Sequence, residues 1–388
     1  MDDIKVINNI SESGLNIVAK AGFNLSADTG NPVGILLRSA DINDCEFNPE
    51  LLAVARSGVG VNNIPVKRCT ENGIAVFNTP GCNSDGVKEL VISALIFTAR
   101  DVFGGMKWVQ GLTGTDEEIT RAVEKGKVQF VGHEIGGKTI GVIGLGSVGY
   151  KVANAALDLG MTVYGYDPHM SVDAAWRISQ NVIHMDSLEA MLPLCDYVSL
   201  HSPLTAETRG MINEKTIAMM KDGVYLINYS RNEVVDEKAV LAALDSGKIT
   251  RFASDFPSAN TIGRPDVRLT PHLGASTQES EINCAVMAAQ ELVEYLKTGN
   301  IKNSVNLPTV TLDRLGVARL CVIHRNVPRM INRFLDLIGQ QNINVEHMIN
   351  KQRGETAYTI IDAGTPIGKD ITDRIAAMDE VMRVRVIG

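Results

Sequence analysis

Short apolar runs alternate along the chain with longer segments in which apolar and polar residues mix. Over the first 97 residues these runs are four or five residues long, as expected for strands that are buried on both faces. The segments between them have the length of helices, so this part of the chain is predicted to be a small α/β domain. The predicted strands are Ile4–Asn8, Gly34–Arg38, Leu52–Arg56 and Ala75–Asn78.

The same alternation continues in a larger region, residues 98–284. A long helix is predicted at Val87–Arg100, and a polar, glycine-bearing stretch then runs to Gly137. The strands that follow predict a doubly wound parallel sheet, in which ligands bind beyond the carboxyl ends of the strands. These strands are Thr139–Ile143, Met161–Tyr166, Tyr197–Leu200, Val224–Asn228, Arg251–Ser254 and Val267–Thr270.

The pattern changes after the long amphipathic helix predicted at Glu279–Thr298. A linker is placed at residues 306–316, and residues 317–388 form a third domain. Its predicted order βαββαβ is ferredoxin-like, and a binding or assembly role is the natural expectation for it. Its elements are the strand Val317–Ile323, the helix Pro328–Gln340, the strands Ile343–Asn350 and Thr356–Ile361, the helix Asp370–Met378 and the strand Val381–Ile387.

A G-x-G-x-x-G sequence follows the predicted strand Thr139–Ile143 directly and leads into the helix predicted at Tyr150–Leu159. Glycines there could simply permit a tight turn, but a strand before them and a helix after them are the context of a dinucleotide site. The first amide groups of the helix would face a pyrophosphate. The loop residues are Gly144, Gly146, Ser147, Val148 and Gly149.

Asp167 ends the next predicted strand, roughly 20 residues past the glycine loop, where this fingerprint has a carboxylate for the ribose hydroxyls. Its charge would repel a 2'-phosphate, and no Arg or Lys follows it directly. The sequence therefore predicts NAD rather than NADP.

Three chemically useful side chains follow successive strands of the predicted sheet. Arg231 can hold a carboxylate with two hydrogen bonds, His272 can exchange a proton, and Asp255 can orient a nicotinamide. Each residue alone also has a structural explanation, such as an Arg at a surface turn. Their common position beyond the strand ends favours hydride transfer to or from a 2-hydroxy acid.

Bulk properties exclude several other classes. The formal net charge is −8 and the basic residues do not cluster, so no nucleic-acid partner is expected. The first residues lack a signal peptide and no apolar run could span a bilayer, which predicts a cytoplasmic protein without a membrane partner. The cysteines lack the spacing of a metal site or a disulfide framework, and reduced thiols are expected. They are Cys45, Cys69, Cys82, Cys195, Cys284 and Cys321.

Together the glycine loop, Asp167, His201–Thr208, Asn228–Asp236, Asp255 and Pro271–Thr277 resemble the D-isomer-specific 2-hydroxyacid dehydrogenases over nearly the whole chain. Arg56–Gly60, Asn78–Pro80 and the C-terminal domain are similar to the members that oxidise 3-phospho-D-glycerate in serine synthesis, whose added module is an ACT regulatory domain. The resemblance implies a flavodoxin-like substrate domain, residues 1–97 completed by 285–305. It also implies a cleft that closes on NAD and substrate, and a homodimer or homotetramer assembled through the nucleotide domains.

The resemblance also assigns roles by matching position. Arg231 and His272 would be catalytic, and both would contact the substrate. Arg38 and Arg56 would bind the phosphate, the alternative being a structural ion pair in the small domain. Further expected substrate contacts are Ser39, Val59 and Gly60. Further expected cofactor contacts are His201, Ser202, Pro203, Thr208, Tyr229, Asp255 and Gly274.

Two departures from the family pattern affect the prediction. The glutamate that pairs with the catalytic histidine is missing, since residues 258–260 are Ser, Ala and Asn. Glu279 or Glu281 could replace it, turnover could be slow, or the protein could bind NAD and substrate with little chemistry. In the C-terminal domain His324, Asn326 and Asn344 match a serine effector site, but Arg329 replaces a glycine there. Serine regulation and loss of effector binding both stay open.

Three functions are consistent with these observations. The first is oxidation of 3-phospho-D-glycerate, and the second is oxidation of another D-2-hydroxy acid, in which Arg38 and Arg56 are structural. The third is a weakly catalytic sensor of NAD(H) that signals through its C-terminal domain. Retention of Arg231 and His272 favours an enzyme, because a pure sensor needs neither residue.

Overall fold

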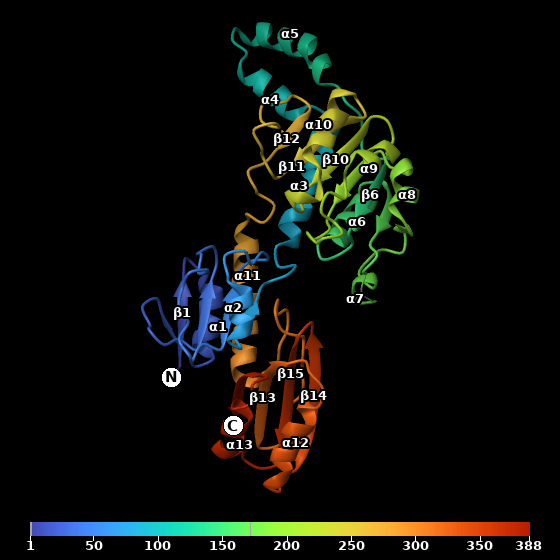
Figure 1. Ribbon diagram of the computed structural model, residues 1–388. Coiled ribbons are helices and arrows are strands. Elements are labelled where there is room, and N and C mark those ends of the chain that lie inside the picture. Colours follow the sequence, from blue (N-terminus) through green and yellow to red (C-terminus); the bar gives the residue numbers. More distant parts are fainter. Residues whose placement is uncertain (1, 171) are drawn as a thin grey trace. The chain divides into compact units, whose positions relative to one another are not determined.

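The computed structural model describes residues 2–170 and 172–388. The chain forms two compact units (Figure 1). Met1–Cys82 together with Glu281–Gly388 make the first unit, and Asn83–Ser280 make the second, which we call the nucleotide unit. None of the helices in the described part of the chain is long and apolar enough to cross a membrane.

The nucleotide unit is built on a parallel sheet with the strand order β12-β11-β10-β9-β6-β7-β8. The order reverses between β6 and β9, which is the switch point where doubly wound sheets bind ligands. The predicted fold is therefore confirmed. The strands are β6 (Thr139–Ile143), β7 (Thr162–Tyr166), β8 (Ile183–His184), β9 (Tyr197–Leu200), β10 (Val224–Asn228), β11 (Ile249–Ser254) and β12 (Val267–Leu269).

Helices pack on both faces of this sheet. Helix α3 (Ser84–Ala99) buries Val91 and Leu95 in the core that also holds Ile140 of β6. Because α3 packs against this sheet, the first boundary between the units falls at 82/83 in the structure, whereas the sequence predicts it at 97/98. The other helices are α6 (Gly149–Asp158), α7 (Val172–Ala175), α8 (Leu188–Met191), α9 (Glu214–Met219) and α10 (Glu237–Asp245), with the 3-10 turns η2 (Leu192–Leu194) and η3 (Asn232–Val234).

The stretch before Gly137 is more regular than the sequence predicts. It contains α4 (Val102–Gln110), α5 (Asp116–Gly126) and the 3-10 turn η1 (Lys127–Phe130). Helix α5 begins with a capping box, in which Thr115 and Glu118 satisfy each other's main-chain N–H groups. The cap favours a helix at this point, although the polar composition of the segment predicts an irregular stretch.

The first unit begins with a five-stranded parallel sheet of order β2-β1-β3-β4-β5, which is the flavodoxin-like order. The long helix α11 (Gln278–Thr298) contributes Ala285, Ala288 and Leu292 to its core, as the resemblance implies. The remaining elements are β1 (Asp3–Ile7), α1 (Glu12–Lys20), β2 (Asn24–Ser26), β3 (Gly34–Leu37), β4 (Ala53–Arg56), α2 (Val66–Glu71) and β5 (Ala75–Phe77).

Residues 318–388, here called the C-terminal module, have the predicted βαββαβ order. Their antiparallel sheet has the order β14-β15-β13-β16, and α12 and α13 pack on one face of it. The elements are β13 (Ala318–Arg325), α12 (Met330–Gln340), β14 (Val345–Arg353), β15 (Thr356–Ala363), α13 (Lys369–Ala376) and β16 (Val381–Ile387).

Residues 299–316, which include the predicted linker, join the C-terminal module to the rest of the first unit through ordered contacts. Ser304 pairs with Phe77 of β5 in a β-bridge, and Ile301 pairs with Val310. On the side of the module, the fully buried Arg319 forms an ion pair with Asp362 at 2.7 Å, and the same guanidinium donates to the carbonyl oxygens of residues 298 and 312. The linker is therefore an ordered part of the core.

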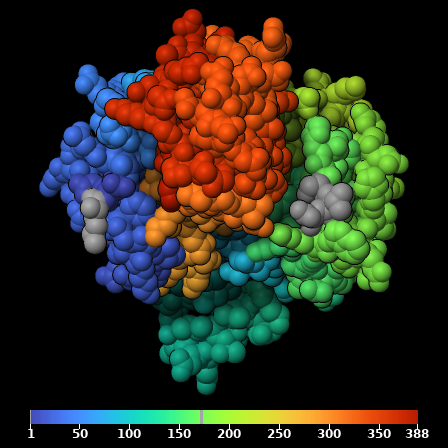
Figure 2. All heavy atoms as spheres, turned by 90° about the horizontal axis from the view of Figure 1, so that it is seen from below, coloured from blue at the N-terminus to red at the C-terminus, as the bar shows by residue number. Residues whose placement is uncertain are grey.

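The module also contacts the small α/β domain directly, through a loop and the end of α2. Arg383 in β16 donates to the main-chain carbonyls of Pro49 and Asn72, each at 2.9 Å, so the module lies against the small domain (Figure 2, red beside blue). Arg385 stacks on the ring of Tyr295 in α11, with its guanidinium carbon 4.6 Å from the ring centroid. These contacts explain why both parts form one compact unit.

One disulfide corrects the expectation of reduced thiols. Cys82, in the loop after β5, is bonded to Cys284 of α11. The two residues are 202 positions apart in sequence, and only the packing of α11 brings them together. Among the described residues the free cysteines are Cys45, Cys69, Cys195 and Cys321.

Candidate active site

The glycine loop lies at the switch point of the large sheet. A Cβ on Gly144 would stand 2.8 Å from the backbone of His201 and Ser202, and its φ of +88° also requires glycine. A Cβ on Gly149 would collide with the Gly144 carbonyl oxygen. Gly146 differs, since its Cβ would project into open space. Gly144 and Gly149 therefore allow the tight turn, and Gly146 leaves its backbone accessible to a pyrophosphate. This arrangement fits a dinucleotide site.

Asp167 ends β7 beside this loop. Its Oδ2 accepts a hydrogen bond from the Leu145 N–H at 2.8 Å, and its Oδ1 accepts one from the His169 N–H at 2.9 Å. The carboxylate thus fixes the glycine loop relative to β7. Each oxygen keeps a further lone pair, so the group can also accept the ribose hydroxyls.

The segment after β9 forms the other wall of the switch point. The His201 N–H donates to the Ile143 carbonyl at 2.7 Å, and Ser202 is almost fully buried. Burial lowers the pKa of the His201 ring to about 3, so the ring is neutral, and its Nε2 contacts Ser199 Oγ at 2.9 Å. The turn continues with Thr208, whose hydroxyl donates to the Pro203 carbonyl at 2.6 Å. His201 therefore supports the loop rather than carrying charge.

Arg231 follows β10, as predicted, and its side chain is exposed. Asn228 fixes its backbone by donating from Nδ2 to the Arg231 carbonyl at 2.9 Å. The Nη1 group donates to the Ser230 carbonyl at 2.7 Å, which leaves the other donors of the fork for a ligand. Tyr229 is buried beside it, and desolvation raises the pKa of its phenol to about 12.

Asp255 organises the loop that carries His272. Its buried carboxylate accepts hydrogen bonds from Thr270 Oγ1 at 2.5 Å, from Leu273 N at 2.8 Å and from Gly274 N at 2.8 Å. His272 itself has a left-handed backbone with φ of +55° and an exposed side chain. The loop therefore turns around Asp255 and presents the imidazole to solvent. The expected contact of Asp255 with a nicotinamide stays a prediction.

The neighbour of the His272 ring is aromatic. Phe256 packs edge-on against it, with 5.4 Å between the ring centroids. Among the described residues the histidines with a carboxylate within 4.0 Å are His169 and His184, and His272 is not one of them. The replacement of the missing glutamate by Glu279 or Glu281 stays a prediction.

Glu281 is bonded to Arg38 in the first unit. Arg38 directly follows β3, and its Nη2 lies 2.5 Å from Oε1 of Glu281 on α11. Both side chains are partly exposed. The adjacent turn is held by Asn8, whose Oδ1 accepts from the main-chain N–H of Ser39 at 3.1 Å. The structural alternative considered for Arg38, an ion pair in the small domain, is therefore present.

Arg56 donates hydrogen bonds to the backbone of the small domain. Its Nε donates to the Arg38 carbonyl at 3.0 Å, and its Nη1 donates to the Gly60 carbonyl. Asn78 donates from Nδ2 to the Val59 carbonyl at 2.6 Å. Arg56 therefore shapes the Ser57–Gly60 turn, and any contact with a phosphate would come in addition to this role.

In the C-terminal module the three effector candidates lie in different environments. His324 is almost fully buried, and its Nε2 contacts Thr359 Oγ1 at 2.9 Å, while desolvation lowers its pKa. Asn326 is exposed, and Asn344 donates to Glu346 at 2.9 Å. Arg329 has a left-handed φ of +70°, a conformation in which glycine is unstrained.

The structure adds three residues that the sequence did not indicate, Phe256, Thr270 and Asn8, which support loops of the site. It also gives Glu281, which the sequence offered as a partner for His272, an ion pair with Arg38. Thr270 and Asn8 stand at strand ends, a signal that was available in the sequence. The contact of Phe256 with His272 and that of Glu281 with Arg38 gave no such signal, because both partners are set by packing between distant segments.

Comparison with known proteins agrees with this geometry. The family description "D-isomer specific 2-hydroxyacid dehydrogenase, NAD binding domain" matches residues 106–274. The D-3-phosphoglycerate dehydrogenase of Haemophilus influenzae is 32% identical over 354 residues, which are 88% of this chain and 82% of that protein. The Bacillus subtilis protein of the same name is 35% identical over 291 residues, or 73% of this chain, and the chain spans only 53% of its length.

Solved structures show the same fold. The NAD+-bound 3-phosphoglycerate dehydrogenase of Entamoeba histolytica superposes with a TM-score of 0.61 at 26% identity, over 79% of this chain and 98% of that one. The D-mandelate dehydrogenase of Rhodotorula graminis superposes with a TM-score of 0.67 at 20% identity, over 80% and 99%, which is a likeness of fold alone.

The glycine loop, Asp167 and the residues beyond β10 to β12 define the NAD-binding domain of a dehydrogenase. The predicted cofactor, NAD, is confirmed. The chain belongs to the D-isomer specific 2-hydroxyacid dehydrogenase family.

Proposed function

We propose that this protein catalyses the NAD-dependent oxidation of 3-phospho-D-glycerate to 3-phosphohydroxypyruvate, the first step of the phosphorylated route to L-serine. The observation that carries the proposal is the placement of Arg231 and His272 beyond β10 and β12, with Asp255 beyond the strand between them. The names of the curated relatives support the choice of substrate.

Each of these side chains has a defined task in that reaction. Arg231 would hold the substrate carboxylate, since its fork offers two parallel donors. His272 would take the proton of the C2 hydroxyl as the alcohol becomes a carbonyl, and would return it in the reverse direction. Bound NAD supplies the acceptor for the C2 hydride. The glycine loop and Asp167 would hold its pyrophosphate and ribose, and the small domain would bind the phosphate through Arg38.

The test is direct. Purified protein is mixed with NADH and 3-phosphohydroxypyruvate, and cofactor oxidation is followed by its near-ultraviolet absorbance, with pyruvate and 2-oxoglutarate as parallel substrates. Turnover restricted to the phosphorylated acid supports the proposal. Turnover with the unphosphorylated acids alone would replace it by the dehydrogenase of another D-2-hydroxy acid, a candidate that the Arg38–Glu281 pair favours.

One observation favours a weakly catalytic NAD(H) sensor as a second candidate. The ring of His272 packs edge-on against Phe256, and His272 is not among the described histidines that have a carboxylate within 4.0 Å. The variant His272→Gln separates the two functions. An enzyme should lose turnover by roughly 10²–10⁴-fold and keep its affinity for NADH, because the imidazole acts on the proton. A basal rate that is unaffected by the substitution would favour the sensor.

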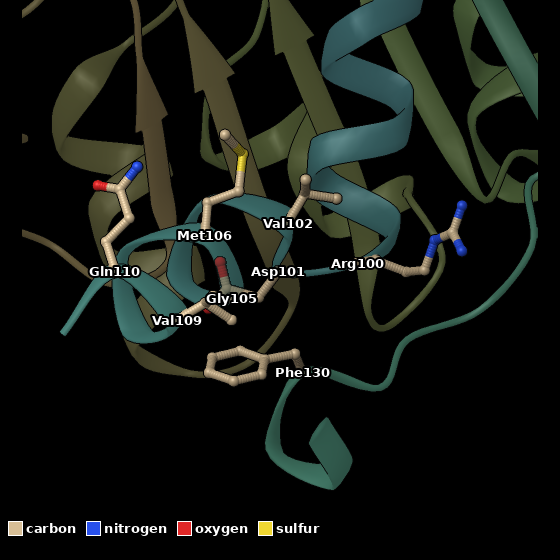
Figure 3. Close-up of a pocket in the computed structure, with 8 residues that line it drawn as sticks. All are labelled: Arg100, Asp101, Val102, Gly105, Met106, Val109, Gln110 and Phe130. Carbon is tan, nitrogen blue, oxygen red and sulfur yellow. The ribbon is translucent and has the colours of Figure 1, made fainter. Parts of the chain in front are cut away.

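Assembly into a homodimer is part of the proposal. Helix α4 and η1 expose several apolar side chains and border a pocket of about 510 Å³, whose lining includes Met106, Val109 and Phe130; Figure 3 shows Val109 of α4 beside the ring of Phe130. Large exposed apolar side chains on one short segment mark interaction surfaces. Met106, which is 56% exposed, is the residue to change. Met106→Lys should lower the mass measured by light scattering, whereas Ile183→Lys on β8 should not.

A cytoplasmic location stays a prediction.

Regulation by serine is the last part of the proposal. An effector role for His324, Asn326 and Asn344 has limited support, because His324 is buried and bonded to Thr359. Serine titration of the initial rate tests it. Inhibition at or below millimolar serine would support regulation, and an unchanged rate would favour loss of effector binding.

A further inference from the structure

The ion pair between Arg38 and Glu281 has a consequence for substrate choice. Its Nη2–Oε1 distance is 2.5 Å, and the two side chains are 41% and 46% exposed. The pair can therefore be reached by a ligand from solvent. A guanidinium whose charge is already balanced attracts a phosphate dianion less than a free one does.

The backbone of Arg38 is fixed, so its side chain is the part that can respond. The Arg38 carbonyl accepts hydrogen bonds from Arg56 Nε at 3.0 Å and from Asn63 Nδ2 at 3.3 Å. Glu281 lies in the first turn of the 21-residue helix α11, so its backbone is part of a regular helix. An exposed ion pair is weak, so a dianion can displace the carboxylate, although the carboxylate then remains nearby as a like charge.

We propose that Glu281 is a specificity-determining residue that balances the charge of Arg38 and weakens the binding of phosphorylated acids relative to unphosphorylated ones. This inference rests on the proposed function, in which Arg38 binds the phosphate. An unphosphorylated acid leaves the ion pair intact. A phosphorylated acid must compete with Glu281, and the enzyme therefore has a smaller preference for phosphate than Arg38 alone would give it.

The experiment measures KM for 3-phosphohydroxypyruvate and for hydroxypyruvate in the full-length protein. Glu281→Gln keeps the shape of the side chain and removes its charge. We expect KM for the phosphorylated acid to fall by roughly 5–20-fold, because a like charge a few ångströms from the dianion is removed. The KM for hydroxypyruvate should stay within about twofold, and the gain should shrink at high salt.

Two further variants show whether the effect acts through Arg38. In the Arg38→Gln background the substitution of Glu281 should give no gain, since no guanidinium is left to release. Glu12→Gln removes an exposed carboxylate elsewhere in the first unit and should change neither KM. An unchanged ratio of the two KM values in Glu281→Gln, or a higher KM for the phosphorylated acid, overturns the inference and leaves the proposed function standing.

A binding measurement keeps the inference testable when turnover is absent. Titration calorimetry with inorganic phosphate compares the natural protein, Glu281→Gln, Arg38→Gln and the double variant that carries both substitutions. Tighter binding in Glu281→Gln that is lost in the double variant supports the inference. Equal binding in all of them overturns it. Absence of turnover with either acid in the natural protein would count against the proposed function alone.

Discussion

The main-chain N–H of His272 donates to the Asp255 carbonyl at 3.2 Å, and the Asp255 carboxylate accepts the N–H groups of the next two residues. Hydrogen bonds to Asp255, a buried residue just beyond β11, therefore fix the backbone on both sides of His272. Its left-handed φ of +55° is maintained by these bonds, because non-glycine residues seldom adopt that conformation unaided.

Replacement of Asp255 by Asn should therefore impair the loop. The side-chain NH2 group of the variant would face a main-chain N–H group, so two donors would oppose each other. A buried donor without an acceptor costs about 1–3 kcal/mol. We expect the free energy of unfolding to fall by that amount and kcat to fall by roughly 10–100-fold. Denaturant unfolding and steady-state kinetics check both. Asp266→Asn, which weakens a partly exposed pair with Arg264, should lower stability slightly and leave kcat alone.

Two glycines of the cofactor loop should respond differently to the same substitution. Gly144→Ala places a Cβ at 2.8 Å from the backbone of His201, so both thermal stability and NADH affinity should fall. Gly146→Ala meets open space, so its melting temperature should stay unchanged while NADH binding weakens, because the new methyl group approaches the pyrophosphate. Thermal denaturation and fluorescence titration with NADH measure the two effects. Equal NADH affinity in Gly146→Ala and the natural protein would contradict the assigned position of the pyrophosphate.

Glu291 on α11 should make stability depend on pH. Burial raises the pKa of this carboxyl to about 8, although Asn303 donates to it at 2.6 Å. The folded state therefore holds a proton that the unfolded state releases near pH 4.5, so stability is full below pH 4.5 and declines as the pH rises to about 8. Glu291→Gln imitates the protonated form. It should therefore remove roughly 3 kcal/mol of the loss in the free energy of unfolding between low and high pH.

Denaturant unfolding between pH 5 and pH 9 measures this slope. The matched control is Glu294→Gln, one turn further along α11, whose carboxylate also accepts an asparagine amide but is not fully buried. The control should keep the slope of the natural protein. A slope that survives unchanged in Glu291→Gln would show that another group causes it.

The disulfide should stabilise the first unit. Because Cys82 and Cys284 are 202 positions apart, their bond restricts a long loop of the unfolded chain. Cys284→Ser should lower the free energy of unfolding by about 2–4 kcal/mol under oxidising conditions. The same variant should show little difference from the natural protein in reductant, and Cys45→Ser, at an exposed free thiol, should have no effect. A non-reducing digest without the linked peptide would refute the bond.

Much of the fold was predictable because its signals are local. The glycines at 144, 146 and 149 require a particular backbone, and their spacing is readable without any knowledge of distant residues. The strands of a parallel sheet are also readable from the sequence. Helices cover both faces of the sheet, so each strand is a continuous apolar run. Asp167 follows such a run directly, and Arg231 and His272 lie a few residues after the ends of two others, so the sequence by itself predicted the NAD site and the residues proposed for catalysis.

The tertiary structure decided how those residues are supported and what occupies them. Arg38 and Glu281 are 243 residues apart, and their ion pair exists because the start of α11 lies beside the end of β3. The disulfide and the Arg319–Asp362 pair likewise depend on packing between segments that are distant in sequence. Side-chain pairs of this kind leave no periodic signal in the sequence, because each charged residue or cysteine has many possible partners along the chain. Only the folded chain selects among them.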